Sequence, residues 1–326
     1  MRALRVAVWG LGHHAIKNIL PAISATNGVE LYGVCSRTAS TVESCVKVWG
    51  CTGWADPASM FIDQNVDIIF VATPIGLHFE HGLQVLQAGK HLWCEKPLTC
   101  RLENTLELLE LSRSQNASVC EGLMYLHHPQ FRKLIDYVHG GDLGKIVSIE
   151  CRFGIPKLER KTFRTDPALG GGALFDVGCY PVSAIQALFP EQRMDVSWSV
   201  VATRDESAVD TDGHAIITLS NGATAHLEWR TNCAYRNEID IWGEKGSVFS
   251  DKVFSKPASY IPTFRLRTTQ GVETTDYGEA GDQFSLMLQD FLGTVSDKEV
   301  AEKERSRIES RAKVLDRIGQ KAGDRV

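Results

Sequence analysis

Residues 4–15 read Leu-Arg-Val-Ala-Val-Trp-Gly-Leu-Gly-His-His-Ala, and this stretch decides the fold. The apolar run over 4–8 predicts a buried strand, and the residues after it form G-x-G-x-x-A before a helical pattern. In this setting Gly10 permits a tight turn, Gly12 lets a ligand approach the backbone, and Ala15 lets the helix lie close to the strand. The helix N-terminus then offers N–H groups to phosphate oxygens. The stretch therefore predicts a dinucleotide-binding loop, whose cofactor contacts are expected at Gly10, Leu11, Gly12, His13 and His14.

Apolar runs that predict strands alternate with helical patterns in the residues that follow. Further strands are expected at 29–34, 66–72 and 118–121, with one more that carries Lys96 at its carboxyl end, and helices are expected at 83–89 and 103–112. Alternation of this kind implies a parallel sheet with right-handed crossovers. We therefore expect an α/β, doubly wound Rossmann domain over residues 1–121.

The end of the second predicted strand indicates which dinucleotide binds. A carboxylate at this place would hold the ribose 2′-hydroxyl of NAD(H), but the chain reads Cys35-Ser36-Arg37. A hydroxyl and a guanidinium suit a 2′-phosphate, so Ser36 and Arg37 predict NADP(H) over NAD(H). The alternative is that Arg37 is only solvated, or stacks on the adenine while either cofactor binds.

The stretch Gly89 to Leu98 places a lysine directly after another predicted strand. It reads Gly-Lys-His-Leu-Trp-Cys-Glu-Lys-Pro-Leu. A lysine at the carboxyl end of a parallel strand faces the crevice where such sheets bind ligands, and Pro97 makes the chain turn there. Lys96 is thus a candidate for chemistry, and the alternative is a surface lysine at a strand end.

The second half of the chain is dominated by strand patterns without intervening helices. The expected strands are 146–153, 196–203, 214–219, 224–229, 238–242 and 247–249. They predict an α+β domain over 122–326 with a large, mostly antiparallel sheet flanked by helices. An open face of such a sheet needs a cover, and a partner subunit commonly provides it. We therefore expect a homodimer or homotetramer through this sheet.

A glycine-rich motif lies between the first two of these strands. It runs from Gly170 to Tyr180, its glycines are expected to give a flexible entry to a helix, and Asp176 and Tyr180 are four residues apart on that helix. A tyrosine hydroxyl has an ordinary pKa near 10, so it needs a nearby cation to act in acid-base chemistry at neutral pH. Lys96 is a candidate for that cation. The alternative is a buried aromatic residue whose hydroxyl bonds to Asp176.

Composition excludes several other classes of protein. The chain has 326 residues and a net charge of -5, so nothing in it suits a nucleic-acid partner. It has no apolar run of eighteen residues, and we expect no membrane partner and a cytoplasmic location. Its nine cysteines form no Cys-x-x-Cys pair, and the adjacent histidines at 13–14 and 127–128 would point to opposite faces of an extended segment. We expect no metal site.

In combination, these motifs resemble the glucose-fructose oxidoreductase, inositol dehydrogenase and rhizopine-catabolism (Gfo/Idh/MocA) family over essentially the whole chain. That resemblance implies hydride transfer between a nicotinamide and a sugar-like alcohol or ketone. It implies that Lys96 touches both the nicotinamide ribose and the reacting oxygen, and that Asp176 and Tyr180 complete the catalytic set. The cofactor contacts it adds are Thr73, Pro74, His78 and Glu95, and the substrate contacts expected are Tyr125, His128, Arg164, Asp176 and Tyr180.

Tyr180 is similar to the branch of this family that holds dihydrodiol and xylose dehydrogenases and ketoreductases of nucleotide-linked deoxysugars. Two positions depart from the family pattern. Ile75 stands where asparagine usually follows Thr-Pro, and Leu126 replaces an arginine common in this branch. Ile75 lacks the amide that would form one hydrogen bond in the cofactor loop, and Leu126 removes a hydrogen-bond donor to the substrate. By the same resemblance, a final helix over 305–318 is expected to pack on the first domain.

Together, the motifs and the resemblance predict an NADP(H)-dependent oxidoreductase acting on a secondary alcohol or ketone of a sugar or sugar-like substrate, with nucleotide-linked ketosugars among the candidates. Tyr180 would give the proton and Lys96 would lower its pKa. One alternative is a dehydrogenase of a free aldose, a cyclitol or a cyclic diol. Another, of a different class, is an NADP-sensing regulatory protein without catalysis.

Overall fold

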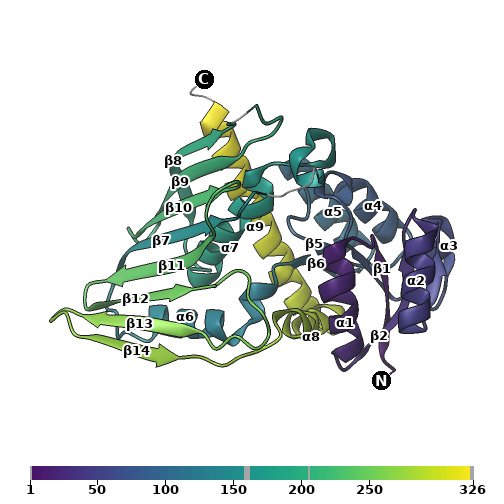
Figure 1. Ribbon diagram of the computed structural model, residues 1–326, viewed down its shortest axis with the longest axis horizontal. Helices are drawn as coiled ribbons and strands as arrows, with labels where there is room; N and C mark the ends of the chain where they lie inside the picture. Colours follow the sequence, from purple (N-terminus) through teal and green to yellow (C-terminus); the bar gives the residue numbers. More distant parts are fainter. Residues whose placement is uncertain (1, 158–161, 205, 324–326) are drawn as a thin grey trace. The chain divides into compact units, whose positions relative to one another are not determined.

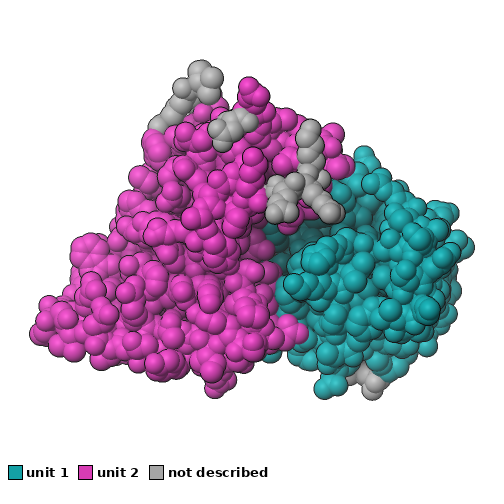
Figure 2. All heavy atoms as spheres, viewed as in Figure 1, with its two compact units in different colours: residues 1–123, 284–309 teal, residues 124–283, 310–326 magenta. Residues whose placement is uncertain are grey.

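The computed structural model describes residues 2–157, 162–204 and 206–323, and it divides into two compact units (Figure 1, Figure 2). The first unit comprises residues 1–123 and 284–309, and the second comprises 124–283 and 310–326. The sequence placed the boundary at 121 and assigned everything after it to the second domain. The segment 284–309 instead belongs to the first unit, because its apolar side chains complete that unit's core.

The first unit is built on a six-stranded parallel sheet in the order β3-β2-β1-β4-β5-β6. Its strands are β1 (Leu4–Trp9), β2 (Val29–Cys35), β3 (Thr52–Trp54), β4 (Ile68–Val71), β5 (His91–Glu95) and β6 (Val119–Gly122). This is the strand order of a Rossmann sheet, with its switch point between β1 and β4. The loops that follow these two strands are therefore where a ligand is expected.

Helices cover the first sheet, and Figure 1 shows α4 and α5 lying together beside it. They are α1 (Leu20–Ala25), α2 (Ala39–Trp49), α3 (Pro57–Ile62), α4 (His78–Gln87), α5 (Leu102–Ser114), α8 (Gln283–Ser296) from Phe284 onward, and α9 (Lys298–Gly323) as far as Glu309. A π-helical segment, Ala15–Ile19, precedes α1, and a 3-10 turn, Ile75–Leu77, precedes α4.

The final helix is longer than the predicted 305–318 and takes part in both units. In the first unit, Ile308 joins the hydrophobic core and Arg305 donates to the carbonyl oxygen of Ala117 at 3.1 Å. In the second unit, the carbonyl oxygen of Ile318 accepts from Ser199 at 2.9 Å, and Arg311 donates to Gln186 at 2.9 Å.

The second unit contains an eight-stranded sheet in the order β14-β13-β12-β11-β7-β10-β9-β8. The strands are β7 (Ile146–Gly154), β8 (Met194–Ala202), β9 (Asp212–Leu219), β10 (Thr224–Arg230), β11 (Arg236–Gly243), β12 (Gly246–Asp251), β13 (Thr263–Thr268) and β14 (Glu273–Tyr277). Neighbouring strands are antiparallel except β7 and β10, which run parallel. The prediction of a mostly antiparallel sheet is confirmed.

Helices of the second unit lie against one face of this sheet (Figure 1). They are α6 (Pro129–His139) and α7 (Cys179–Leu188), with 3-10 turns at Met124–His127, Phe163–Thr165 and Pro167–Leu169 and a π-helical segment at Leu174–Gly178. The stretch Pro167–Leu188 is long and apolar enough to cross a membrane by composition, but 72% of its apolar 18-residue window is buried in the structure. Its apolar character is that of a core helix.

Candidate active site

The loop after β1 holds two glycines, one required by the packing of the protein and one that leaves the backbone open to a ligand. Gly10 has φ +104°, and a Cβ there would lie 2.7 Å from the carbonyl carbon of Ala72, so the packing of the protein itself requires glycine. Gly12 is exposed, and no described atom lies within 4 Å of the place where its Cβ would be. The backbone at Gly12 is open, just before the helical N–H groups of Ala15–Ile19. These features fit the pyrophosphate of a dinucleotide.

The other side chains of this loop have different surroundings. Leu11 is buried, so it offers a ligand only its backbone, whereas His13 is exposed. The ring of His14 contacts the end of β5, where its Nε2 lies 3.1 Å from Glu95 Oε1. Its Nδ1 lies 3.0 Å from the side-chain amide nitrogen of Asn18.

The end of β2 carries the groups predicted to select the cofactor. Gly10 N–H donates to the carbonyl oxygen of Cys35 at 2.9 Å, which places the strand end beside the phosphate loop. Arg37 is exposed, and Ser36 Oγ accepts from the backbone N–H of Thr38 at 3.3 Å. Arg37 is thus available to an anion at this edge of the sheet.

The loop after β4 is held by a histidine that sequence analysis missed. Thr73 Oγ1 lies 2.8 Å from His81 Nδ1, and the His81 ring stacks on Trp9 with the ring centroids 3.7 Å apart. Pro74 starts the turn at Ile75–Leu77, and the Ile75 side chain is buried. The position where the family resemblance leads one to expect asparagine therefore contributes an apolar side chain to the interior. The signal for His81 was its spacing, three residues after His78 on one face of α4.

Lys96 follows β5 directly, at the carboxyl edge of the sheet, and is 9% exposed. Burial raises the pKa of the neighbouring Glu95 carboxyl, but His14 and then Lys96 outweigh that effect, so the pKa lies below its usual value. The peptide between Lys96 and Pro97 is cis. The Pro97 carbonyl oxygen lies 2.9 Å from Nδ1 of the buried His78. Lys96 thus lies between two residues that are each held by a histidine.

Asp176 in the second unit forms an ion pair with another predicted site residue. Arg164 Nε donates to Asp176 Oδ2 at 2.6 Å, and the guanidinium carbon lies 4.9 Å from the centroid of the Phe163 ring. The Asp176 side chain is 7% exposed and that of Arg164 is 36% exposed. The structure therefore pairs these two residues, with the carboxylate inside and the guanidinium nearer the surface.

The glycines before Asp176 form a fixed turn, not the flexible entry predicted from sequence. A Cβ on Gly171 would lie 2.6 Å from the carbonyl oxygen of Arg164, and Gly172 N–H donates to that same oxygen at 3.1 Å. Gly172 has φ +133°, and a Cβ there would lie 2.1 Å from Asp210 Oδ1. Asp210 also accepts from the N–H of Leu174 at 2.7 Å. Asp210 is a positioning residue of this turn that no local sequence pattern revealed.

Tyr180 is the last residue of this motif and the second residue of α7, and it is 8% exposed. Its ring packs against Phe153 and Phe254, with centroid distances of 5.0 and 5.6 Å. The hydroxyl of Tyr125 donates to the Tyr180 carbonyl oxygen at 3.2 Å and lies 2.6 Å from Ser183 Oγ. Burial raises the pKa of Tyr125 well above its usual value. Tyr125 was predicted as a substrate contact, and in the structure its buried hydroxyl contacts α7.

His128 was also predicted as a substrate contact, and in the structure its Nδ1 serves a helix cap. Its Nδ1 accepts from the N–H of Gln130 at 3.0 Å, so it caps the N-terminus of α6. Burial and then the charge of Lys256 lower the pKa of His128 to about 4. Its Nε2 is buried and has no hydrogen-bond partner among the residues that the structure describes. His128 therefore caps α6 in the structure.

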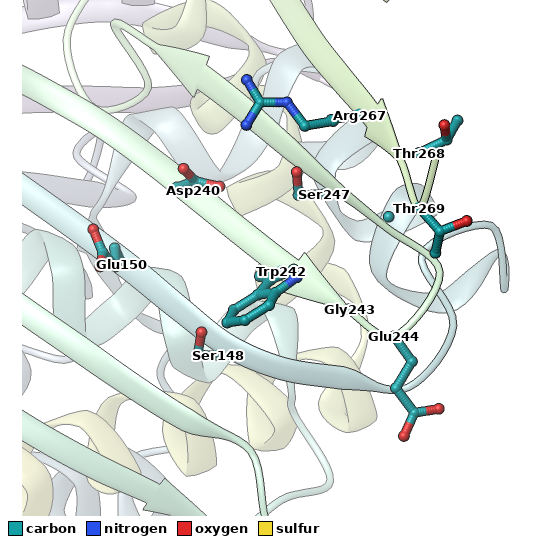
Figure 3. Close-up of a pocket in the computed structure, with 11 residues that line it drawn as sticks. Ser148, Glu150, Asp240, Trp242, Gly243, Glu244, Ser247, Arg267, Thr268 and Thr269 are labelled. Carbon is teal, nitrogen blue, oxygen red and sulfur yellow. The ribbon is translucent and has the colours of Figure 1, made fainter. Parts of the chain in front are cut away.

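A cavity of about 430 Å³ lies on the open face of the second sheet (Figure 3). It is lined by Ser148, Glu150, Asp240, Trp242, Gly243, Glu244, Gly246, Ser247, Arg267, Thr268 and Thr269. None of these residues belongs to the predicted catalytic set. Trp242 is 60% exposed there, which is unusual for so large an aromatic side chain.

Histidine, cysteine and carboxylate side chains do not gather into a metal-binding group anywhere in the described ranges 2–157, 162–204 and 206–323. All nine cysteines are free thiols.

Comparison with known proteins identifies the family of both units. Residues 4–123 match the family model described as "Oxidoreductase family, NAD-binding Rossmann fold", and residues 131–249 match the "GFO/IDH/MocA C-terminal domain". A dTDP-3,4-didehydro-2,6-dideoxy-alpha-D-glucose 3-reductase from Streptomyces violaceoruber is 30% identical over 84% of this chain and 80% of its own. A D-xylose 1-dehydrogenase (NADP(+)) from Haloferax volcanii is 25% identical over 97% of this chain and 96% of its own.

Among solved structures, a 3-ketoreductase from Actinomadura kijaniata in complex with NADP and TDP-benzene matches with a TM-score of 0.93. It is 28% identical, and the match covers 98% of both chains. The similarity thus extends over both units. The chain belongs to the Gfo/Idh/MocA family of oxidoreductases.

Proposed function

We propose that this protein is an NADP(H)-dependent ketoreductase that acts on a keto group of a nucleotide-linked sugar. The observation that carries the proposal is Lys96, a buried lysine directly after β5, on the edge where the open phosphate loop lies. Such a lysine has little use in a protein that only binds a dinucleotide. The relatives named above include 3-reductases of dTDP-linked sugars and a ketoreductase with NADP and a TDP compound, which supports the substrate class.

The cofactor proposed is NADP(H), held at its phosphates by the loop at Gly10 and Gly12 and at its 2′-phosphate by Arg37. The nicotinamide would supply the hydride. Tyr180 would donate a proton to the carbonyl oxygen of the substrate. Lys96 would lower the pKa of that tyrosine and stabilise the negative charge that develops on the oxygen. Asp176, oriented by Arg164, would accept a hydrogen bond from a substrate hydroxyl.

The test is NADPH consumption with nucleotide-linked 3-ketosugars, using the wild-type chain, Lys96→Met and Tyr180→Phe. Both variants should bind NADPH normally and lose turnover by about a hundredfold or more. Lys133→Met and Tyr235→Phe are matched controls, because Lys133 lies on α6 and Tyr235 is exposed near β11, and both should keep full activity. Near-normal rates in Lys96→Met and Tyr180→Phe would contradict the proposed mechanism.

A second candidate is a dehydrogenase of a free sugar, favoured by the match to the xylose dehydrogenase over nearly the whole chain. The same residues would serve oxidation, with Tyr180 accepting the proton. NADP reduction by free aldoses, cyclitols or cyclic diols, with no response to nucleotide-linked ketosugars, would establish it. Tight NADPH binding without turnover of either class would indicate a regulatory protein instead.

We propose further that two copies of the chain associate through the open face of the second sheet. That face carries an exposed Trp242 and a network in which Arg152 lies within ion-pair distance of Glu228 and Glu238. Light scattering should report a dimer or a tetramer, and Trp242→Glu should lower the mass. The nine free thiols fit a reducing compartment, and we propose the cytoplasm.

A further inference from the structure

The ring of His78 links two loops at the carboxyl edge of the first sheet. His78 is the first residue of α4 and is fully buried. Its Nδ1 lies 2.9 Å from the carbonyl oxygen of Pro97, and its Nε2 lies 2.8 Å from the carbonyl oxygen of Thr73. One carbonyl follows β5 and the other follows β4, so a single side chain ties together the ends of two adjacent strands.

Both ring nitrogens are therefore directed at the protein's own backbone. A carbonyl oxygen only accepts, so each of these bonds needs a proton on the ring nitrogen. The neutral ring can make one of the bonds at a time and the imidazolium can make both. Burial lowers the pKa of His78, while the two carbonyl oxygens and Glu95 act in the opposite direction. Lys96 from the same loop and His81 on the same helix are the other charged or titratable groups that face it.

The bond to Pro97 bears directly on the catalytic lysine. The Pro97 carbonyl is one peptide unit beyond Lys96, while on the other side Glu95 is held by His14 at 3.1 Å. The backbone around Lys96 is thus fixed on both sides. A leucine of similar volume in place of His78 would fill the same space without burying a polar ring, but it would leave both carbonyl oxygens without this donor.

We propose that His78 is a positioning residue for Lys96 and not a cofactor contact. This inference rests on the proposed function, because it assumes that Lys96 takes part in the reaction. The ring sets the path of the chain through residues 95–97 and so the place of the Lys96 ammonium group. Small displacements of such a group cost turnover far more than they cost binding.

The experiment compares His78→Leu, His78→Asn and Lys96→Met in the full chain with NADPH and the ketosugar. His91→Asn is the matched control, since His91 is at the opposite end of β5 and accepts from the N–H of Ser118 at 2.9 Å. We expect His78→Leu to lose about tenfold to a hundredfold in kcat, with the NADPH dissociation constant changed by less than about threefold. His78→Asn, which keeps one donor, should recover part of the loss. The pH profile of kcat should shift in both His78 variants and stay unchanged in His91→Asn.

The outcomes separate the two ideas. If Lys96→Met is inactive while both His78 variants keep normal kcat and pH profile, the positioning role is wrong and the proposed function stands. If His78→Leu instead weakens NADPH binding with kcat unchanged, His78 is a cofactor contact, as the family resemblance implied. If Lys96→Met itself is fully active, the proposed function fails before His78 is considered. A lower melting temperature in His78→Leu with normal kinetics would also contradict the inference.

Discussion

Arg164 contacts the motif around Asp176 in two ways. Its guanidinium donates to the Asp176 carboxylate at 2.6 Å, and its backbone carbonyl oxygen accepts from Gly172. The arginine therefore holds both the carboxylate and the turn that begins the helix carrying it. This makes Arg164 a residue through which the position of Asp176 can be tested.

Replacing Arg164 should affect stability and turnover together. Arg164→Ala removes a hydrogen bond between charged groups, so we expect a loss of about 1.5–3 kcal/mol in the free energy of unfolding. We expect kcat/KM to fall about tenfold or more, because the carboxylate is no longer oriented. Arg164→Lys keeps the charge but not the planar geometry, so it should retain only part of the stability and of the kcat/KM that Arg164→Ala loses. Urea unfolding and steady-state kinetics of Arg164→Ala, Asp176→Asn and the double variant measure the coupling, and strictly additive effects would show that the pair does not act as a unit.

The two glycines of the phosphate loop should respond differently to alanine. At Gly12 no described atom would meet the new methyl group, so Gly12→Ala should keep its melting temperature and weaken NADPH binding about tenfold or more. At Gly10 the methyl group would collide with the Ala72 backbone in a conformation that alanine rarely adopts, so Gly10→Ala should be less stable by several degrees. Calorimetry and fluorescence titration check both. Equal effects on stability would contradict these roles.

Arg37 should decide between the two nicotinamide cofactors. Arg37→Ala removes the exposed guanidinium beside the end of β2, so NADPH affinity should fall about tenfold or more while NADH affinity stays the same. Arg101→Ala, at an exposed arginine elsewhere in the unit, is the control. Dissociation constants for both cofactors give the answer, and an unchanged NADPH preference would remove Arg37 from the site.

Stability should fall as the pH drops below about 6.5, the ordinary histidine pKa. Burial lowers the pKa of His78 and His91, and it lowers that of His81 and His128 to about 4. For His81 and His128, the unfolded chain therefore takes up protons between pH 6.5 and 4 that the folded chain does not bind, and each of these two histidines contributes a slope of about 1.4 kcal/mol per pH unit over that range.

His128→Asn isolates one of these contributions. Asparagine is a good N-cap, so α6 should keep its start while one titrating group disappears. Denaturant unfolding at several pH values should show a shallower decline than in the wild-type chain. His226→Asn, at an exposed histidine on β10, should leave the slope unchanged. A wild-type stability that is constant between pH 7 and 5 would contradict the buried, neutral state of these side chains.

Sequence patterns predicted the first unit well because each buried strand is a short apolar run between a turn and an amphipathic helix. The strands at Leu4 and Val29 begin where expected. The short β3 was not predicted, because Thr52–Trp54 has too few residues to show a pattern. The exposed outer strands β13 and β14 were also missed, since their side chains alternate weakly between core and solvent.

The roles of site residues were harder to predict where their side chains form hydrogen bonds with backbone groups. Lys96 is recognisable because its place depends only on a strand end and a proline. The roles of His128 and Tyr125 depend on which backbone group each ring nitrogen or hydroxyl meets, and that follows from chain folding over distances that no local pattern encodes. The same holds for Asp210, which supports a turn that precedes it by nearly forty residues.

The place of β7 in the second sheet has a consequence for how the unit folds. β7 comes first in the sequence, yet it lies in the middle of the sheet, parallel to β10 on one side and antiparallel to β11 on the other. Its partner residues, such as Ile149 and Ile241, are roughly ninety residues apart in the chain. During synthesis both edges of β7 therefore stay unpaired until β10 and β11 have been synthesised. Such long-range pairing slows folding. The apolar inner side of this strand is then exposed to association with other chains at the very stage when its own partners are still missing.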